Sequence, residues 1–351
     1  MGMSLRRLVP LLALLLSLFS MAVASRAIVA EWMRLQDADR ARLALADLKA
    51  ALVAAEMASR ERGPSNALMG QGSAAPAPLR EHLAQARART DQALQALQGA
   101  LTARAGQPHQ ALAQRHLERA IAHLQAGRAR VDAVAALPHV AADAQSIQQA
   151  VQTMASVIPE LGPAAALMAD ALQRAAPALA SSVQGARMAA DLREFAGLLG
   201  SHLTAALTLG RPLTVEERIA FERTLGRLDQ LQRQLALRLD DAAPGDPVLV
   251  AWQMVNADYF LRGLVLAQAV AGRGDEAATQ GQNPASFAQA YVPRMDAIVA
   301  LRDQLLTQVS TAVAREAVDA RWALAITGSV TATTLLLLGL MAATLKRRLL
   351  D

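Results

Sequence analysis

Three histidines in the first half of the chain have the spacing of a shared helix face. His109, His116 and His123 recur every seven residues, which places each about 10.5 Å from the next along one side of a helix. One Zn²⁺ ion cannot bridge that distance, because Zn–N bonds are only about 2.1 Å long. We therefore interpret the histidines as a polar seam between helices, with a pH-responsive seam as the alternative.

Signatures of catalysis and of cofactor binding do not occur in the sequence. It contains no Gly-rich phosphate loop, no His-Glu-x-x-His, no Gly-x-Ser-x-Gly and no cysteine. The absence of cysteine excludes disulfides, thiolate nucleophiles and thiolate metal sites. The paired carboxylates at 216–217 and 240–241 lie at predicted helix ends, and we interpret them as helix-end residues rather than as a catalytic pair. We predict a protein that is not an enzyme and that needs no cofactor and no metal.

Two uncharged apolar runs are long enough to cross a membrane. Residues 8–25 would reach about 27 Å as a helix, close to the hydrocarbon thickness of a bilayer, and residues 323–345 are longer. Basic residues precede the first run (Arg6 and Arg7) and follow the second (residues 346–348), so both termini are expected in the cytoplasm. The protein between the runs would then lie in the periplasm, anchored in a bacterial inner membrane.

The first apolar run has a second interpretation as a cleaved signal peptide. Residues 22–24 (Ala-Val-Ala) fit an A-x-A cleavage site, and the run is short for a span. The helical pattern continues without a break through residues 26–28, which favours an uncleaved anchor. We therefore expect transmembrane helices at 1–25 and 322–345 and a cytoplasmic stub at 346–351.

The net positive charge of the chain comes mainly from its two ends. The formal net charge is +5 and the pI is near 10.5. Five basic residues and one acidic residue lie in the two predicted cytoplasmic ends, so the central part is left near +1. Such a weak charge does not indicate nucleic-acid binding, and the basic ends suit the anionic headgroups of a lipid bilayer.

The composition predicts an all-α fold. The sequence is rich in Ala, Leu, Gln and Arg and contains only 3% aromatic residues, which favours helix over sheet. Leucines three and four residues apart, as at Leu228, Leu231 and Leu235, indicate buried helix stripes. We predict eight helices, at residues 26–62, 78–103, 109–136, 140–158, 164–209, 215–241, 247–271 and 285–345.

Local signals mark several ends of these helices. Thr214 and Glu217 have the spacing of a capping box, in which each side chain bonds the backbone N–H of the other residue at a helix start. Residues 70–78 and 272–284 are rich in Gly and Pro and are predicted to be exposed loops. The Arg-Gly-Asp at 273–275 lies in the second of these loops, and we interpret it as a coincidence rather than an adhesion site.

A weak internal repeat appears at an offset of 138 residues. Residues 59–62 then align with residues 197–200, at comparable places in a unit of long helix, loop and helix. Two packed four-helix bundles built from related halves, at residues 26–160 and 161–321, explain this pattern.

Three short stretches resemble a known family. They are residues 59–63 (SRERG), 191–197 (DLREFAG) and 209–217 (LGRPLTVEE), and the resemblance covers most of residues 26–321. The stretches resemble the nitrate- and nitrite-sensing domain and its uncharacterised relatives. The resemblance implies an all-helical sensor of two packed four-helix bundles, which in relatives is joined to diguanylate cyclases, histidine kinases, chemoreceptors or antiterminators.

The resemblance also implies a set of ligand-binding arginines. In the family, arginines bind the anion between the bundles, and Arg62 matches the arginine of the Glu-Arg motif, with Arg60 beside it and Arg193 in the second half. A planar, permanently charged guanidinium suits nitrate, because it can donate two parallel hydrogen bonds. The second half reads Gly-Leu-Leu-Gly at 197–200, where relatives usually have a Gly-Arg-Glu-Arg-like run. We therefore expect weaker or different selectivity, and a structural or surface role for Arg60 and Arg62 is the alternative.

These observations predict a membrane-anchored periplasmic sensor. It would detect a small anion or polar ligand and pass a shift of its last helix to a cytoplasmic output domain, either beyond Asp351 or on a partner. The alternative is a non-sensing scaffold that recruits a protein partner. Receptors of this shape commonly signal as symmetric pairs, and Gly328 and Ala332 permit close approach of two spans. We therefore also expect a homodimer.

Overall fold

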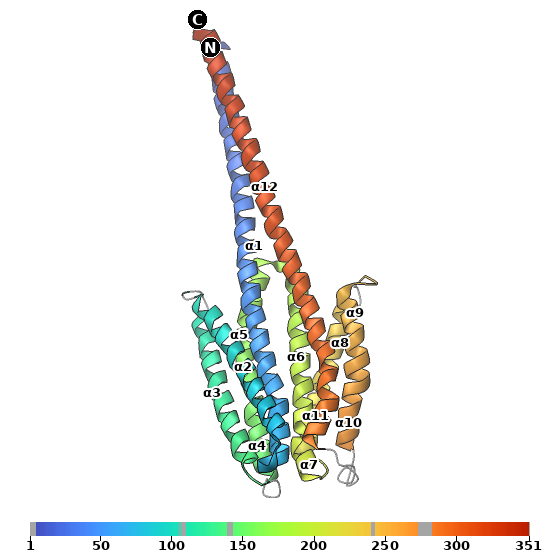
Figure 1. The fold of residues 1–351 in the computed structure, drawn as a ribbon. Coiled ribbons are helices and arrows are strands. Elements are labelled where there is room, and N and C mark those ends of the chain that lie inside the picture. Colours follow the sequence, from blue (N-terminus) through green and yellow to red (C-terminus); the bar gives the residue numbers. More distant parts are fainter. Residues whose placement is uncertain are drawn as a thin grey trace. The chain divides into compact units, whose positions relative to one another are not determined.

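The structure, a computed structural model, consists of helices joined by short turns (Figure 1). It describes residues 5–104, 106, 110–138, 143–239, 243–272 and 283–350. These residues contain no β-strand, so the predicted all-α class is confirmed. The chain divides into two compact units, one formed by Ala44–Val309 and the other by Met1–Leu43 with Ser310–Asp351.

The first and last helices, α1 (Leu5–Gln71) and α12 (Asp296–Leu350), contribute residues to both units. The other elements all lie in the unit Ala44–Val309. They are η1 (Gly72–Ala74), α2 (Ala77–Thr102), α3 (Gln110–Ala135), α4 (Ala144–Ala155), α5 (Val157–Ala175), η3 (Pro177–Leu179), α6 (Ala180–His202), α7 (Thr204–Leu209), α8 (Val215–Leu239), α9 (Pro247–Met254), η4 (Val255–Leu264), α10 (Val265–Gly272), α11 (Pro284–Tyr291) and η6 (Val292–Met295).

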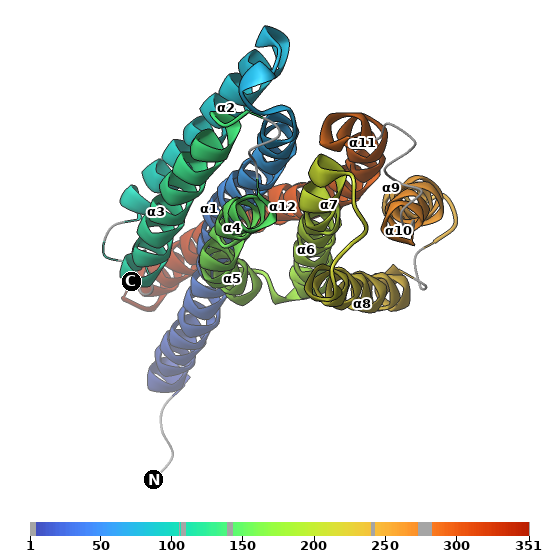
Figure 2. The same cartoon turned by 90° about the horizontal axis from the view of Figure 1, so that it is seen from below.

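Helices within the unit Ala44–Val309 pack on leucine stripes. Helix α3 contacts α2, α4 and α5, while α6 contacts α8 (Figure 2). Leu48 of α1 and Leu228 and Leu235 of α8 have no exposed surface, and Leu231 is half-buried, as the three-and-four spacing predicts. The capping box is also confirmed, because the Glu217 N–H donates to Thr214 Oγ1 (3.2 Å) and the Thr214 N–H donates to the Glu217 carboxylate (2.8 Å).

The predicted end of the first helix at Arg62 is wrong, because α1 continues to Gln71. Small residues in this stretch serve packing rather than a turn: a Cβ added at Gly70 would lie only 2.7 Å from Cγ of Pro284. The chain turns at Gly72, whose φ of +59° lies in the left-handed region that glycine adopts without strain. The exposed loop predicted at residues 70–78 is therefore confirmed only in part: residues 73–74 and 76–78 are exposed, whereas Gly70, Gly72 and Ala75 are buried and residues 70–71 belong to α1.

Prolines divide two other predicted helices at places that the hydrophobic pattern does not reveal. The stretch 164–209 is interrupted at Pro177, whose preceding residue leaves the helical region, while Pro163 is accommodated inside α5. The last predicted helix, 285–345, is divided into α11 and α12 by the 3₁₀ turn η6, which contains Pro293. The predicted border between two bundles after residue 160 falls within α5 and stays a prediction.

Helices α9, η4 and α10 follow one another without a break, and η4 is a π-helix that carries the buried Tyr259. A π-helix holds an extra residue per turn and is frequent at functional sites. Some predicted features lie outside the described residues, namely His109, the start of the helix predicted at residue 140, and the Arg-Gly-Asp with most of its predicted loop.

Both terminal helices contain a membrane-compatible window. The helical runs 14–74 and 284–344 each include an 18-residue window of mean hydropathy 1.6 and 1.8, none of it buried inside the protein. Within the unit of Met1–Leu43 and Ser310–Asp351, Arg34 of α1 donates a hydrogen bond to Glu316 of α12 (3.0 Å). The two helices therefore lie next to one another at this level (Figure 1).

Candidate anion-binding site

Consecutive charged residues of α1 point to different neighbours, because successive residues of an α-helix are turned by about 100°. Arg60 donates a hydrogen bond to Asp296, the first residue of α12 (3.0 Å). Glu61 is fully buried and accepts two hydrogen bonds from Arg128 of α3 (2.7 and 2.8 Å). Both contacts are ion pairs that hold α1 to other helices of the same unit.

Arg62, the next residue, pairs with Glu194 of α6. Its Nη1 lies 2.5 Å from Oε1 of the carboxylate and its Nη2 lies 2.9 Å from Oε2, so both carboxylate oxygens are engaged. Nη2 also donates to Ser59 Oγ (2.8 Å). Only 2% of Arg62 is exposed. The carboxylate of Glu194 explains how so buried a guanidinium is tolerated, and it occupies the fork that a planar anion would use.

Arg193 of α6 lies beside this ion pair and has no carboxylate partner among the described residues. It is buried, its Nη1 donates to Ser59 Oγ (2.5 Å), and its Nε has no hydrogen-bond partner there. Burial, together with the positive charge of Arg62, lowers the pKa of Arg193 to about 10. A buried guanidinium with an unmet donor is costly, and an anion beside it would offset that cost.

Ser59 and Gly197 allow the two guanidinium groups to meet. Ser59 Oγ accepts from both Arg62 and Arg193, so its own O–H remains available as a donor. A Cβ added at Gly197 would lie 2.9 Å from Nη1 of Arg193 and 3.1 Å from Nη2 of Arg62. Glycine at this position therefore lets both arginines lie directly against the backbone of α6.

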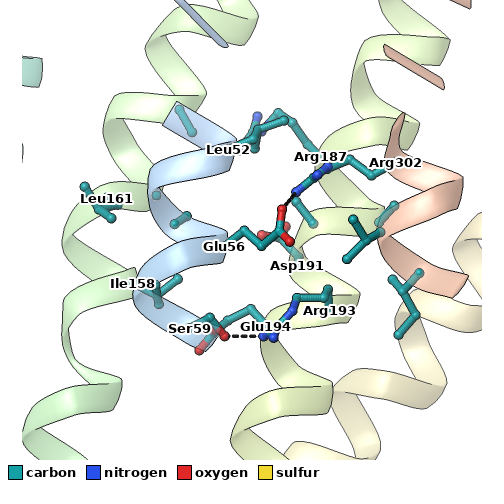
Figure 3. Close-up of a pocket in the computed structure, with 17 residues that line it drawn as sticks. Leu52, Glu56, Ser59, Ile158, Leu161, Arg187, Asp191, Arg193, Glu194 and Arg302 are labelled. Atoms are coloured by element: carbon teal, nitrogen blue, oxygen red, sulfur yellow. Dashed lines mark hydrogen bonds and ion pairs between the residues drawn. The ribbon is translucent and has the colours of Figure 1, made fainter. Parts of the chain in front are cut away.

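A small cavity of about 60 Å³ lies on one side of Arg193 (Figure 3). Its lining includes the carboxylates of Glu56, Asp191 and Glu194, and Glu56 forms an ion pair with Arg302 (2.5 Å). Burial, with the charge of Glu194 adding to it, raises the pKa of Asp191 to about 6. The lining also includes Arg187, Arg193 and Arg302, so three guanidinium groups face three carboxylates and the wall has no excess of positive charge to offer an anion.

A larger cavity of about 480 Å³ lies on the other side of the same arginine. Ser59, Arg62, Arg193 and Gly197 form part of its wall, and Arg60 lines it as well. None of its described lining residues is Asp or Glu. This cavity therefore presents cationic and hydroxyl donors without a competing carboxylate on its wall, which is the environment that an anion requires.

The predicted residues Arg60, Arg62 and Arg193 all line this larger cavity, but their local roles differ. Arg60 and Arg62 are engaged by carboxylates of the protein, whereas Arg193 is not. Arg211, which also lies in a resembling stretch, pairs with Glu217 (2.7 Å) instead. The ligand role of the three arginines stays a prediction.

Two site residues, Ser59 and Gly197, were not singled out in the sequence analysis, and neither was Glu194, the partner of Arg62. All three lie in stretches that resemble the family. Their place in those stretches was one available signal. The internal repeat, which aligns residue 59 with residue 197, was a second signal, but alignment in a repeat does not predict contact.

The two described histidines of the predicted seam, His116 and His123, both face polar groups. His123 Nδ1 is 2.7 Å from Ser156 Oγ, between α4 and α5, and His116 Nδ1 is 3.6 Å from the carboxylate of Glu160 in α5. Among the described residues no group of three His, Cys, Asp or Glu side chains is arranged to hold a metal ion.

Comparison with known proteins places this arrangement in a family. A solved structure, described as that of the NasR transcription antiterminator, is similar at 17% identity and a TM-score of 0.46, over 93% of this chain and 82% of that chain. No match was found among curated proteins. A family model described as nitrate and nitrite sensing matches residues 53–310, which include Ser59, Arg62, Arg193 and Gly197. Because this match spans well over half of its length, the chain belongs to the nitrate and nitrite sensing family.

Proposed function

We propose that this chain is a membrane-anchored sensor of a small nitrate-like anion, and that the anion binds at Arg193. The observation that carries the proposal is the state of this guanidinium, which is buried and forms no ion pair with a carboxylate among the described residues, whereas Arg62, whose Nε is also unmet, pairs with Glu194. The family supports nitrate or nitrite as the class of ligand.

The neighbouring groups suit a trigonal planar anion. One anion oxygen would accept from Arg193, and another would accept the free proton of the Ser59 hydroxyl. Arg62 would add its positive charge at short range while remaining paired with Glu194. Such charge-assisted hydrogen bonds, made in a site that is largely shielded from water, are stronger than those at the surface.

The signal would pass to α12 through two contacts. Tyr291 immediately precedes η6 and α12, and its hydroxyl donates to the carbonyl of Ala196, which adjoins Gly197 (2.7 Å). Arg60 lines the larger cavity and binds Asp296, the first residue of α12. Anion binding that shifts α6 or Arg60 would therefore act on the start of α12, and we propose that this helix carries the shift across the inner membrane to a cytoplasmic output.

We further propose that the sensor is a homodimer joined along its spans. A Cβ added at Gly328 of α12 would meet no atom within 4 Å, so this surface is open to a second copy. Crosslinking in membranes at native expression should yield a dimer that Gly328→Leu weakens. A monomer under those conditions would rule the dimer out.

Calorimetry on the full-length chain in lipid nanodiscs tests the anion site. Nitrate and nitrite should bind saturably, Arg193→Met should abolish binding, and Arg193→Lys should weaken it, because lysine keeps the charge and loses the planar fork. Arg233→Met is the matched control, since Arg233 is 76% exposed and pairs with Asp229 on its own helix.

Nitrate binding that is unchanged in Arg193→Met would refute the site. A failure of nitrate, nitrite, chloride and sulfate alike to bind would favour the alternative of a membrane-tethered scaffold for a protein partner.

A further inference from the structure

The larger cavity is far more spacious than a nitrate-like anion requires. Its volume of about 480 Å³ compares with the ~10–15 Å³ that a single water-sized guest needs, and lies within the ~300–1,000 Å³ range of pockets for organic ligands. The anion-binding groups, Ser59 and Arg193, occupy only one part of its wall. The rest of the cavity can therefore hold an uncharged part of a larger ligand.

Most of the remaining wall is apolar. Phe287 and Tyr291 stack with ring centroids 5.0 Å apart and contribute aromatic surface. The other apolar lining residues include Met57, Leu79, Leu207, Ala288 and Met295. Water in contact with such a wall finds few hydrogen-bonding partners, so a guest that carries hydrocarbon gains from displacing it.

The charged residues of the lining all favour an anion. Arg60 and Arg62 have carboxylate partners, whereas Arg193 and the exposed Arg89 form no ion pair within the described part of the chain. No described lining residue is acidic. A cationic or zwitterionic guest therefore has no described carboxylate in the lining for its positive group, and the lining favours a ligand that is anionic at one end and largely apolar over the rest.

We propose that this cavity binds an organic monocarboxylate. The carboxylate lies against Arg193 and Ser59, and the aliphatic or aromatic body fills the space between Leu79, Leu207 and Phe287. This inference rests on the proposed function only in placing the anionic group at Arg193. A carboxylate offers the planar oxygen pair that a guanidinium binds, so it takes the place of nitrate there.

Calorimetry with acetate, butyrate, hexanoate and benzoate, beside nitrate, tests the proposal on the full-length chain in nanodiscs. Affinity should rise from acetate to hexanoate by up to about fourfold for each methylene buried, and hexanoate should compete with nitrate. Ala288→Leu and Ala86→Leu fill part of the cavity from α11 and α2, not from α1 and α6, which carry Arg62 and Arg193. Each should weaken hexanoate binding at least ~10-fold and leave nitrate binding unchanged.

Ala84→Leu is the control, because Ala84 is exposed on the same helix as Ala86 and does not line the cavity. Nitrate binding with no gain from acetate to hexanoate would overturn this inference and leave the proposed function intact. Graded carboxylate binding without nitrate binding would support the inference and refute nitrate as the ligand. Binding of hexanoate that both cavity-filling variants retain would place the carboxylate elsewhere, and no binding of any anion would refute both proposals.

Discussion

Arg62 and Glu194 form a two-point ion pair between α1 and α6, across 132 residues of sequence. Arg193, the residue directly before Glu194, has no such partner among the described residues. Two buried arginines in the same site are therefore expected to affect stability in opposite directions.

Removing the guanidinium of Arg62 should destabilise the protein. Arg62→Met leaves the mostly buried Glu194 carboxylate without its cation, which typically costs about 3–5 kcal/mol of unfolding free energy. The double variant Arg62→Met, Glu194→Leu should recover most of this loss. Urea unfolding of the full-length chain followed by circular dichroism measures both. A loss below about 1 kcal/mol in the single variant would show that the pair does not matter for stability.

Removing the guanidinium of Arg193 should instead stabilise the ligand-free protein. Arg193→Met replaces a buried charge that forms no ion pair among the described residues with an apolar side chain, and the lowered pKa of Arg193 corresponds to a gain of up to about 3 kcal/mol. Urea unfolding measures this gain as well. Added nitrate should raise the urea midpoint of the natural protein and leave the midpoint of Arg193→Met unchanged. A large destabilisation by Arg193→Met would mean that Arg193 holds the fold together rather than a ligand.

Gly197→Ala should disturb the site, because its Cβ would lie 2.9 Å from Arg193 Nη1. The arginines would have to move, so anion affinity should fall at least ~10-fold and stability should not improve. Gly226→Ala is the matched control, since Gly226 also lies inside a helix but a Cβ there meets nothing within 4 Å. That control should gain up to about 1 kcal/mol, because alanine favours helix. An equal gain in both variants would contradict the close contact at Gly197.

Asp191 should make stability depend on pH in a defined direction. Its folded-state pKa of about 6 lies above its ordinary value of 3.8, so its favourable contribution is fully present below about pH 4 and is lost as pH rises through 6. Asp191 keeps exposed surface, so solvent screens much of this effect, and Asp191→Asn should stabilise the protein at pH 7 by less than about 1 kcal/mol and have little effect at pH 4.

His202 acts in the opposite direction, because burial lowers its pKa to about 4 and stability is lost as pH falls from 6.5 towards that value. The difference in melting temperature between the natural protein and Asp191→Asn, measured from pH 4 to 7, isolates Asp191. A difference that does not change with pH would contradict the raised pKa.

The proposed topology can be tested by labelling, because the natural chain contains no cysteine. A cysteine placed at the exposed Ala84 should react with a membrane-impermeant maleimide in cells with a permeable outer membrane. A cysteine at Arg347 should react only after the inner membrane is opened. Labelling of the position 347 variant in intact cells, or a mature protein that lacks the first 24 residues, would contradict the two-span orientation.

The sequence predicts the fold class well, because helix formation depends on signals that lie close together along the chain. The leucine stripe through Leu228 and Leu235 and the capping box at Thr214 are of this kind, and both are confirmed. The end of α1 was not predictable in this way. Gly70 has the composition of a turn, but its role is set by contact with Pro284, more than 200 residues later in the chain.

The same limit applies to the site. Arg62 follows Glu61, and Arg193 precedes Glu194, so the sequence alone suggests similar surroundings for both arginines. In the structure Glu61 pairs with Arg128 and Glu194 pairs with Arg62, so Arg193 forms no ion pair with any described residue. Which carboxylate serves which arginine depends on tertiary packing, and residue spacing carries no information about it.

Three consecutive side chains of α1, those of Arg60, Glu61 and Arg62, point in different directions, and their contacts limit how this part of the helix can move. Their ion pairs connect α1 to α12, α3 and α6 in directions about 100° apart. Rotation of α1 about its own axis would lengthen at least one of these contacts, whichever way it turned. Motion that preserves all of them must therefore carry α3, α6 and the start of α12 along as one body, and independent rotation of α1 requires that one ion pair first be broken.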